Sequence, residues 1–206
     1  MQIENRDETL DALNEIRSIM DRSARFISLS GRSGIWAGST ALAGSAIAWY
    51  WLQQPGYSYV GDVNHASLDY FDSYTMHFIW LAIGVFVTAF AGGLYFTSQK
   101  AKKQKQKLWN TASRQMLLQL FFPVFAGGAF TLMFIYYGCG LFVAPACLVF
   151  YGLALISASR HTLSDIRYLG MFDVALGCAA LFFPGYGLYF WALGFGVLHI
   201  LYGAIM

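Results

Sequence analysis

The sequence predicts an all-α, polytopic membrane protein in which six transmembrane helices follow an amphipathic cytoplasmic helix. Of its 206 residues, 57% are hydrophobic and only 12% are charged, whereas about a quarter of the residues of a soluble domain are charged. All 13 Lys and Arg residues fall in segments 6–32, 100–114 and 160–167, and a pair of apolar stretches follows each segment. Because basic residues concentrate on the cytoplasmic side of a membrane, this alternation places both chain ends in the cytoplasm.

Residues 1–30 are predicted to form the cytoplasmic amphipathic helix, separate from a transmembrane bundle at residues 31–206. Apolar residues recur there at spacings of three and four, the pattern of a helix with one apolar face. Acidic residues occupy the early turns and Arg17, Arg22 and Arg25 the late turns, an order that complements the helix dipole. The helix either lies on the cytoplasmic surface or acts as a docking or dimerisation element. Its acidic character supports the second use, because helices that bind lipid surfaces are basic.

Each of the six apolar stretches approaches the length of a transmembrane helix, which needs about 20 residues. The predicted spans cover, approximately, residues 34–52, 76–96, 116–137, 141–159, 168–183 and 187–205. In the first span, Gly34 and Gly38 form a GxxxG motif. Small residues let helix backbones approach closely in lipid, so we expect this helix to pack inside the bundle.

Asp173 is the one acidic residue placed inside a predicted span, where an ionisable group is costly and typical of a functional site. It follows Arg167 by six residues, which corresponds to roughly 9 Å of helix at 1.5 Å per residue. His199 lies at a similar depth when residues are counted back from the carboxyl terminus. We therefore predict an intramembrane polar layer that consists of Asp173, His199, Gln119, Ser39 and Thr40.

This polar layer has three interpretations, which differ in the role of Asp173. The carboxyl group can tie helices together by hydrogen bonds, bind a solute or ion, or relay protons. Only the last two make the layer a functional site. We expect Asp173 and His199 to form a direct or one-water contact, with side chains no more than about 7 Å apart.

Arginines are predicted at the level of the lipid headgroups, next to the ends of the spans. These interfacial residues are Arg25, Arg32, Arg160 and Arg167. For the basic loop at 100–114, anionic lipid headgroups are a nearer partner than nucleic acid. We therefore expect the lipid bilayer as a partner, and no nucleic acid.

The loop between the first two spans carries oxygen and imidazole groups of the kind that bind divalent metals. These weak candidate ligands are Asp62, His65, Asp69, Asp72 and His77. Their spacing matches no metal-binding motif, so we expect a solvated loop without a metal.

Enzymatic activity and cofactors are not expected from the motifs. The sequence contains no HExxH, GxSxG or Walker A pattern, the signatures of metalloproteases, serine hydrolases and P-loop enzymes. A bis-histidine haem is not expected because His77 and His199 fall near opposite faces of the membrane. An intramembrane enzyme that acts on lipids stays open as a weaker alternative.

The segment from Arg25 to Gly34, RFISLSGRSG, and the span after it carry a family resemblance. Together they resemble small six-span inner-membrane proteins of Bacteroidetes-type bacteria. The resemblance implies a multi-pass protein of the bacterial inner membrane. It supplies no activity and no catalytic residues.

The leading functional hypothesis is binding or translocation of a small solute, ion or lipid through the polar layer around Asp173. The alternative is a non-catalytic interaction or regulatory module, in which the helix at residues 1–30 recruits a protein partner or a second copy of the chain. The first hypothesis requires a cavity that reaches the polar layer, whereas the second does not.

Overall fold

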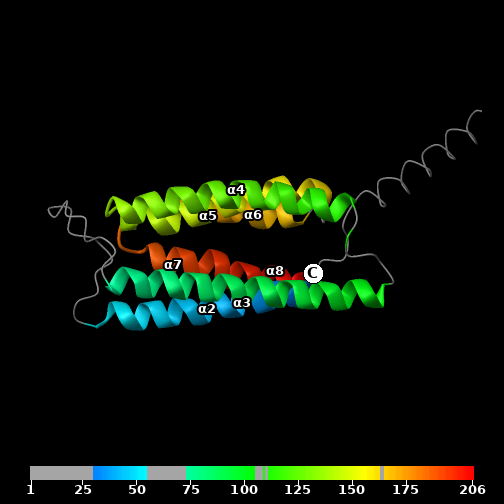
Figure 1. Cartoon of the computed structure of the whole chain (residues 1–206), viewed down its shortest axis with the longest axis horizontal. Helices are drawn as coiled ribbons and strands as arrows, with labels where there is room; N and C mark the ends of the chain where they lie inside the picture. Colours follow the sequence, from blue (N-terminus) through cyan, green and yellow to red (C-terminus); the bar gives the residue numbers. More distant parts are fainter. Residues whose placement is uncertain (1–29, 55–72, 105–108, 110, 163–164) are drawn as a thin grey trace, which may run out of the picture.

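The computed structural model confirms an all-α fold for the part of the chain that it describes, which comprises residues 30–54, 73–104, 109, 111–162 and 165–206. No β-strand occurs within these residues. The helices run along one common direction and form an elongated bundle (Figure 1). The predicted helix at residues 1–30 lies almost entirely outside the described residues.

The described residues form six helical rods, and each of the first three is a single uninterrupted α-helix. These three are α2 (Gly31–Leu52), α3 (Ser73–Lys103) and α4 (Thr111–Tyr136). The fourth rod consists of η1 (Gly140–Phe142), α5 (Val143–Ala158) and η2 (Ser159–His161), and the fifth is α6 (Ile166–Ala180). The last rod consists of α7 (Gly187–Trp191), the π-helical turn η3 (Ala192–Leu198) and α8 (His199–Ile205).

The rods form two layers with the last rod between them (Figure 1). Helices α4, α5 and α6 make one layer, α2 and α3 make the other, and α7–α8 lies between the layers. Successive rods run in opposite directions. The basic residues within the described ranges therefore lie at one end of the bundle, hereafter the basic end; they are Arg32, Lys100, Lys102, Lys103, Arg114, Arg160 and Arg167.

Four helical segments of the described chain are long and apolar enough to cross a membrane. They are Thr75–Lys103, Thr111–Tyr136, Gly140–His161 and Gly187–Ile205. The other two predicted spans correspond to α2, which is diluted by glycine, serine and threonine, and α6, which has only 15 residues. Length and composition thus identify four of the six predicted spans.

Glycines hold two pairs of rods at backbone contact. A Cβ atom on Gly152 of α5 would lie 2.5 Å from the carbonyl oxygen of Gly170 on α6, and one on Gly170 would lie 2.6 Å from that of Gly152. Likewise, a Cβ on Gly38 of α2 would lie 2.5 Å from the carbonyl oxygen of Gly196 in η3. A Cβ atom this close to a backbone oxygen would force the two helices apart. The GxxxG motif of α2 therefore packs against the last rod, because small residues permit this approach, whereas Trp49 and Tyr50 of the same helix are exposed.

Candidate binding cavity and its polar triad

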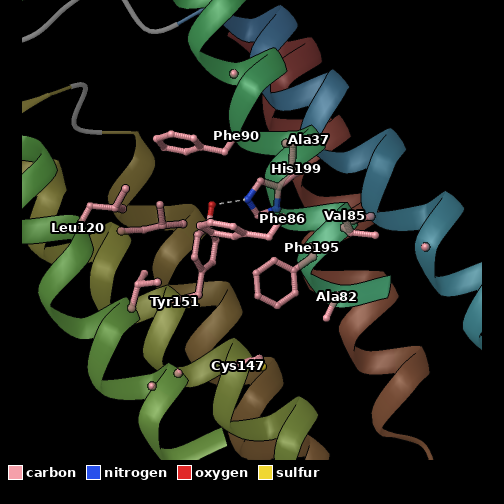
Figure 2. Close-up of a pocket in the computed structure, with 18 of the residues that line it drawn as sticks. Ala37, Ala82, Val85, Phe86, Phe90, Leu120, Cys147, Tyr151, Phe195 and His199 are labelled. Carbon is pink, nitrogen blue, oxygen red and sulfur yellow. Dashed lines mark hydrogen bonds between the residues drawn. The ribbon is translucent and has the colours of Figure 1, made fainter. Parts of the chain in front are cut away.

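A cavity of about 1650 Å³ lies between the two layers of the bundle, and every long rod contributes to its walls. Ligand pockets for drug-sized molecules have volumes of about 300–1,000 Å³. The walls are predominantly aliphatic and aromatic, with Phe86 and Phe90 from α3 and Leu120 from α4 among them (Figure 2). The volume and the apolar walls suit a molecule with long hydrocarbon chains.

The cavity adjoins a gap between α3 and α4. These helices do not pack against each other along their length; a contact between them is made by the rings of Phe90 and Phe121, whose centroids are 6.0 Å apart. Gly93 on α3 and Gly128 on α4 line the cavity, and a Cβ atom on either residue would have no atom within 4 Å. The space between α3 and α4 is therefore wide enough for additional atoms.

Tyr151 of α5 and His199 of α8 point toward each other across the cavity (Figure 2). The Tyr151 hydroxyl lies 2.9 Å from Nε2 of His199, and Nδ1 of His199 lies 2.9 Å from the carbonyl oxygen of Gly194. A carbonyl can only accept a hydrogen bond, so Nδ1 carries the proton and, in the neutral ring, Nε2 accepts from Tyr151. The ring of Phe195 packs beside Tyr151 at a centroid distance of 4.9 Å. The Tyr151–His199 hydrogen bond joins the layer of α4, α5 and α6 to the last rod, α7–α8.

Gly194 belongs to the π-helical turn η3, and it contacts both ionisable residues predicted for the polar layer. Its carbonyl accepts from the His199 ring, and a Cβ atom placed on it would lie 3.0 Å from Oδ1 of Asp173. Single π-helical turns are frequent at functional sites because they alter the pairing of backbone carbonyls. Here the turn places the Gly194 carbonyl oxygen beside His199 and the Gly194 Cα beside Asp173.

Asp173 is completely buried, with an exposed fraction of 0%. Neither carboxyl oxygen has a hydrogen-bond partner among the described residues. Asp173 shares one face of α6 with Gly170 and Gly177, both of which approach α5 at close distance, and it interacts electrostatically with Tyr151 of that helix. A buried polar group without a partner is costly, so the burial of Asp173 calls for an explanation. We call Tyr151, His199 and Asp173 the polar triad.

Of the five residues predicted for the polar layer, Asp173 and His199 are buried and both contact Gly194. The expected direct hydrogen bond between them is not formed, because both His199 nitrogens have other partners. A contact through one water stays a prediction. The sequence did not predict Tyr151 as a member of this site. A tyrosine in an apolar span carries no periodic or spacing signal that separates it from aromatic residues at the membrane interface.

The other three predicted residues do not join the triad. Gln119 lies exposed on α4. The hydroxyls of Ser39 and Thr40 donate to carbonyl oxygens one turn earlier in α2, at 2.8 Å each, the acceptors being those of Ile35 and Ala37. Their hydroxyl protons are therefore used within their own helix.

The interfacial and metal candidates have mixed outcomes. Arg32, Arg160 and Arg167 are exposed at the basic end, whereas Arg25 lies outside the described residues. Among the metal candidates only His77 is described, and it packs against Trp51 at a ring-centroid distance of 5.9 Å. Within the described ranges no three His, Cys, Asp or Glu side chains gather as a metal site would require.

Hydroxyl groups gather where the cavity approaches the basic end. The residues that contribute them come from the starts of α2 and α4, the end of α3, the segment after η2 and the end of α8; they are Ser30, Ser33, Thr97, Ser98, Ser113, Thr162 and Tyr202. The Tyr202 hydroxyl has no hydrogen-bond partner within the described part of the chain. The cavity is thus amphiphilic, with apolar walls and a polar end.

The fold and the cavity define the class: a small helical protein with several apolar helices that could cross a membrane, and an amphiphilic cavity that is open to its surroundings. No protein-family model, no curated protein and no solved structure matches the chain.

Proposed function

We propose that the protein is an integral membrane protein that binds a membrane lipid, takes it up between α3 and α4, and moves or presents it within the bilayer. The lipid chains would occupy the apolar part of the cavity, and the polar group would lie at the hydroxyl-rich end. The observation that carries this proposal is an apolar cavity of about 1650 Å³ whose hydroxyl groups gather at the basic end.

A lipid explains this cavity better than a hydrophilic solute does. Polar groups that leave water without new hydrogen bonds lose several kcal/mol, about 2–7 by transfer measurements. Along most of its length the cavity offers a polar solute few partners beyond the Tyr151–His199 pair. A hydrocarbon chain needs none. The aromatic walls formed by Phe86 and Phe90 accept it without such a cost.

Lipid selectivity would come from the polar end. A chain that moves from the bilayer into the cavity gains little hydrophobic free energy, because both surroundings are apolar. A hydrogen bond from the Tyr202 hydroxyl, which has no partner within the described part of the chain, and attraction to the nearby basic residues must then supply the preference. A Lys or Arg near a membrane surface contributes about 1 kcal/mol of attraction to anionic lipid. We therefore infer that an anionic headgroup is preferred.

We further infer six spans in a bacterial inner membrane, with both chain ends on the cytoplasmic side. With 22 residues, α2 is roughly 33 Å long at 1.5 Å per residue, enough to cross a hydrocarbon core of about 30 Å. The shorter α6 lies against α5 and the central rod, so it need not face lipid along its whole length. The common location of the described basic residues supports a cytoplasmic basic end.

The test uses two glycines of α3 that differ in one respect. Gly93 and Gly84 both face space that is free of other atoms within 4 Å, but only Gly93 lines the cavity. In Gly93→Phe the new ring would enter the cavity, whereas in Gly84→Phe it would not. The probe is an anionic phospholipid with a photoactivatable acyl chain, offered to the full-length protein in nanodiscs.

We expect Gly93→Phe to reduce crosslinking by about tenfold, which corresponds to ~1.4 kcal/mol. Gly84→Phe should crosslink like the unmodified protein, with crosslinked peptides from the cavity walls. Equal crosslinking of the two variants, or crosslinks confined to the outer surface, would refute lipid binding in the cavity. A zwitterionic probe that crosslinks as well as the anionic one would refute the headgroup preference alone.

A further inference from the structure

The polar triad separates into a part that meets the cavity and a part that does not. Tyr151 and His199 line the cavity, and Asp173 is not among its lining residues. Asp173 instead lies behind Gly194, in the region where glycines bring α5 and α6 into backbone contact. The hydrogen-bonded pair therefore meets the cavity, whereas the buried carboxyl group does not.

We propose that Asp173 is a proton-binding site, which Tyr151 and His199 connect to the cavity. An unpartnered carboxyl group with an exposed fraction of 0% is the ligand-binding group. The proton is the one cation that such a site accepts without further ligands, because a metal ion would require several oxygen atoms around it. The inference goes beyond lipid binding, and its test needs no lipid ligand.

Proton uptake would use the observed Tyr151–His199 hydrogen bond and a further transfer from Tyr151 to Asp173. A proton from the cavity first binds Nε2 of His199, after the Tyr151 hydroxyl has turned away from that nitrogen. Tyr151 then transfers its hydroxyl proton to the Asp173 carboxylate, directly or through one water, and takes the proton from Nε2. One O–H bond forms at Asp173 and one N–H bond breaks at His199. Tyr151 and His199 return to their initial states, and the negative charge of Asp173 is neutralised.

Within the described ranges, few other titratable groups face Asp173. Tyr151 faces it from α5 and His199 reaches the same region from α8, whereas η3 carries no titratable residue. Cys147 of α5 is directed to Thr131, with 3.8 Å between its Sγ and the threonine Oγ1. Among the charged residues, Arg167 is six residues away on α6, or roughly 9 Å along the helix axis. The proton state of Asp173 therefore depends mainly on the triad.

The experiment measures the carboxyl group directly by infrared difference spectroscopy of the full-length protein in liposomes during pH jumps. We expect the carbonyl band of a protonated carboxylic acid, which shifts in D2O and is lost when the pH is raised. The band should be absent in Asp173→Asn and retained in Asp165→Asn, a matched change at the basic end. A pH-independent spectrum, or a band that survives in Asp173→Asn, would overturn the proton site.

The relay has its own readout. Tyr151→Phe and His199→Gln should keep the band but slow its response to a pH jump by about a hundredfold, at the lower end of the contribution of positioned proton-transfer groups. Tyr189→Phe, a change at an exposed tyrosine of α7, should leave the rate unchanged. Unaltered rates in both Tyr151→Phe and His199→Gln would overturn the route through these two residues.

A second measurement covers the case in which Asp173→Asn does not fold. A membrane-soluble carbodiimide reacts with protonated carboxyl groups in lipid, and mass spectrometry locates the adduct. In the unmodified protein we expect modification at Asp173 that decreases as the pH rises. The absence of an adduct at every pH at which the protein is folded would contradict protonation of Asp173. Neither measurement depends on the crosslinking result for the lipid site.

Discussion

Replacing Gly152 by alanine tests the close packing that seals Asp173. The added Cβ atom would lie 2.5 Å from the Gly170 carbonyl oxygen, whereas ordinary contacts begin at 3.4 Å. It would also lie 2.8 Å from a methyl group of Val174 and 2.9 Å from the Val174 backbone nitrogen. Two of these three neighbours are backbone atoms, which cannot turn away as a side chain can. Helices α5 and α6 must therefore move apart.

The expected magnitude combines two opposing terms. Overpacking of this kind costs about 1–3 kcal/mol, while alanine is a better helix former than glycine by about 1 kcal/mol. Gly128→Ala on α4 supplies the control, since a Cβ atom there would have no atom within 4 Å. Both variants gain the same helix-propensity stabilisation from replacing glycine by alanine. The difference between Gly152→Ala and Gly128→Ala should therefore equal the packing cost, ~1–3 kcal/mol.

The assay is the midpoint of thermal unfolding of each variant in the same detergent. For a chain of this size 1 kcal/mol corresponds to roughly 2–4 °C, so Gly152→Ala should melt several degrees below Gly128→Ala. Gly170→Ala should behave like Gly152→Ala. The double variant should lose less than the sum, because helices that have already separated accommodate the second methyl group. Equal midpoints for Gly152→Ala and Gly128→Ala would refute the backbone contact between α5 and α6.

Two further predictions concern topology and the packing of α2. Single cysteines are introduced on a background without native cysteines. Lys103→Cys should react with an impermeant maleimide only from the cytoplasmic side, and Gln54→Cys only from the opposite side. Labelling of both residues from one side would contradict the antiparallel arrangement of α2 and α3. Gly92→Ala should lower the unfolding midpoint because its methyl group would collide with the Trp36 indole, whereas Gly93→Ala, with open space beside it, should not. The reverse order would refute the packing of α2 on α3.

Counting along the sequence located the depth of ionisable groups but not the side of the helix on which they lie. Asp173 and His199 were found because a charged or titratable group in a span is conspicuous by itself. Gln119, Ser39 and Thr40 were placed at a comparable depth by the same count. Each residue turns an α-helix by about 100°, so residues at one depth can face the core or the surroundings. Depth alone could not show that these three residues lie outside the triad.

The π-helical turn adds a rotation that no count could include. Its segment, Ala192–Leu198, is rich in glycine and apolar residues and looks like any other part of a span. A π-helical turn holds more residues per turn than an α-helix, so it shifts the face on which His199 lies. Because the sequence does not reveal this change of helix face, the hydrogen bond from the His199 ring to the Gly194 carbonyl could not be predicted.

Glycines have opposite uses in this bundle, which explains why the cavity was not predictable. Gly38 and Gly152 occur where backbones touch, whereas Gly93 and Gly128 face open space. All four lie in similar apolar sequence, and the distinction is made by the partner helix. A GxxxG motif therefore indicates a candidate contact, while a glycine without a partner can equally widen a cavity.

Whether a cavity of this size is stable depends on what surrounds the protein. Protein interiors are close-packed, and few of their voids exceed the size of a water molecule. A space of about 1650 Å³ would therefore demand either collapse of the helices or a filling substance. In a bilayer, acyl chains are available at the gap between α3 and α4 and match its aromatic walls. Filling by lipid, as proposed, would reconcile the separation of these helices with the tight packing of α5 on α6, and the Tyr151–His199 pair would be the polar group in the wall of the filled cavity.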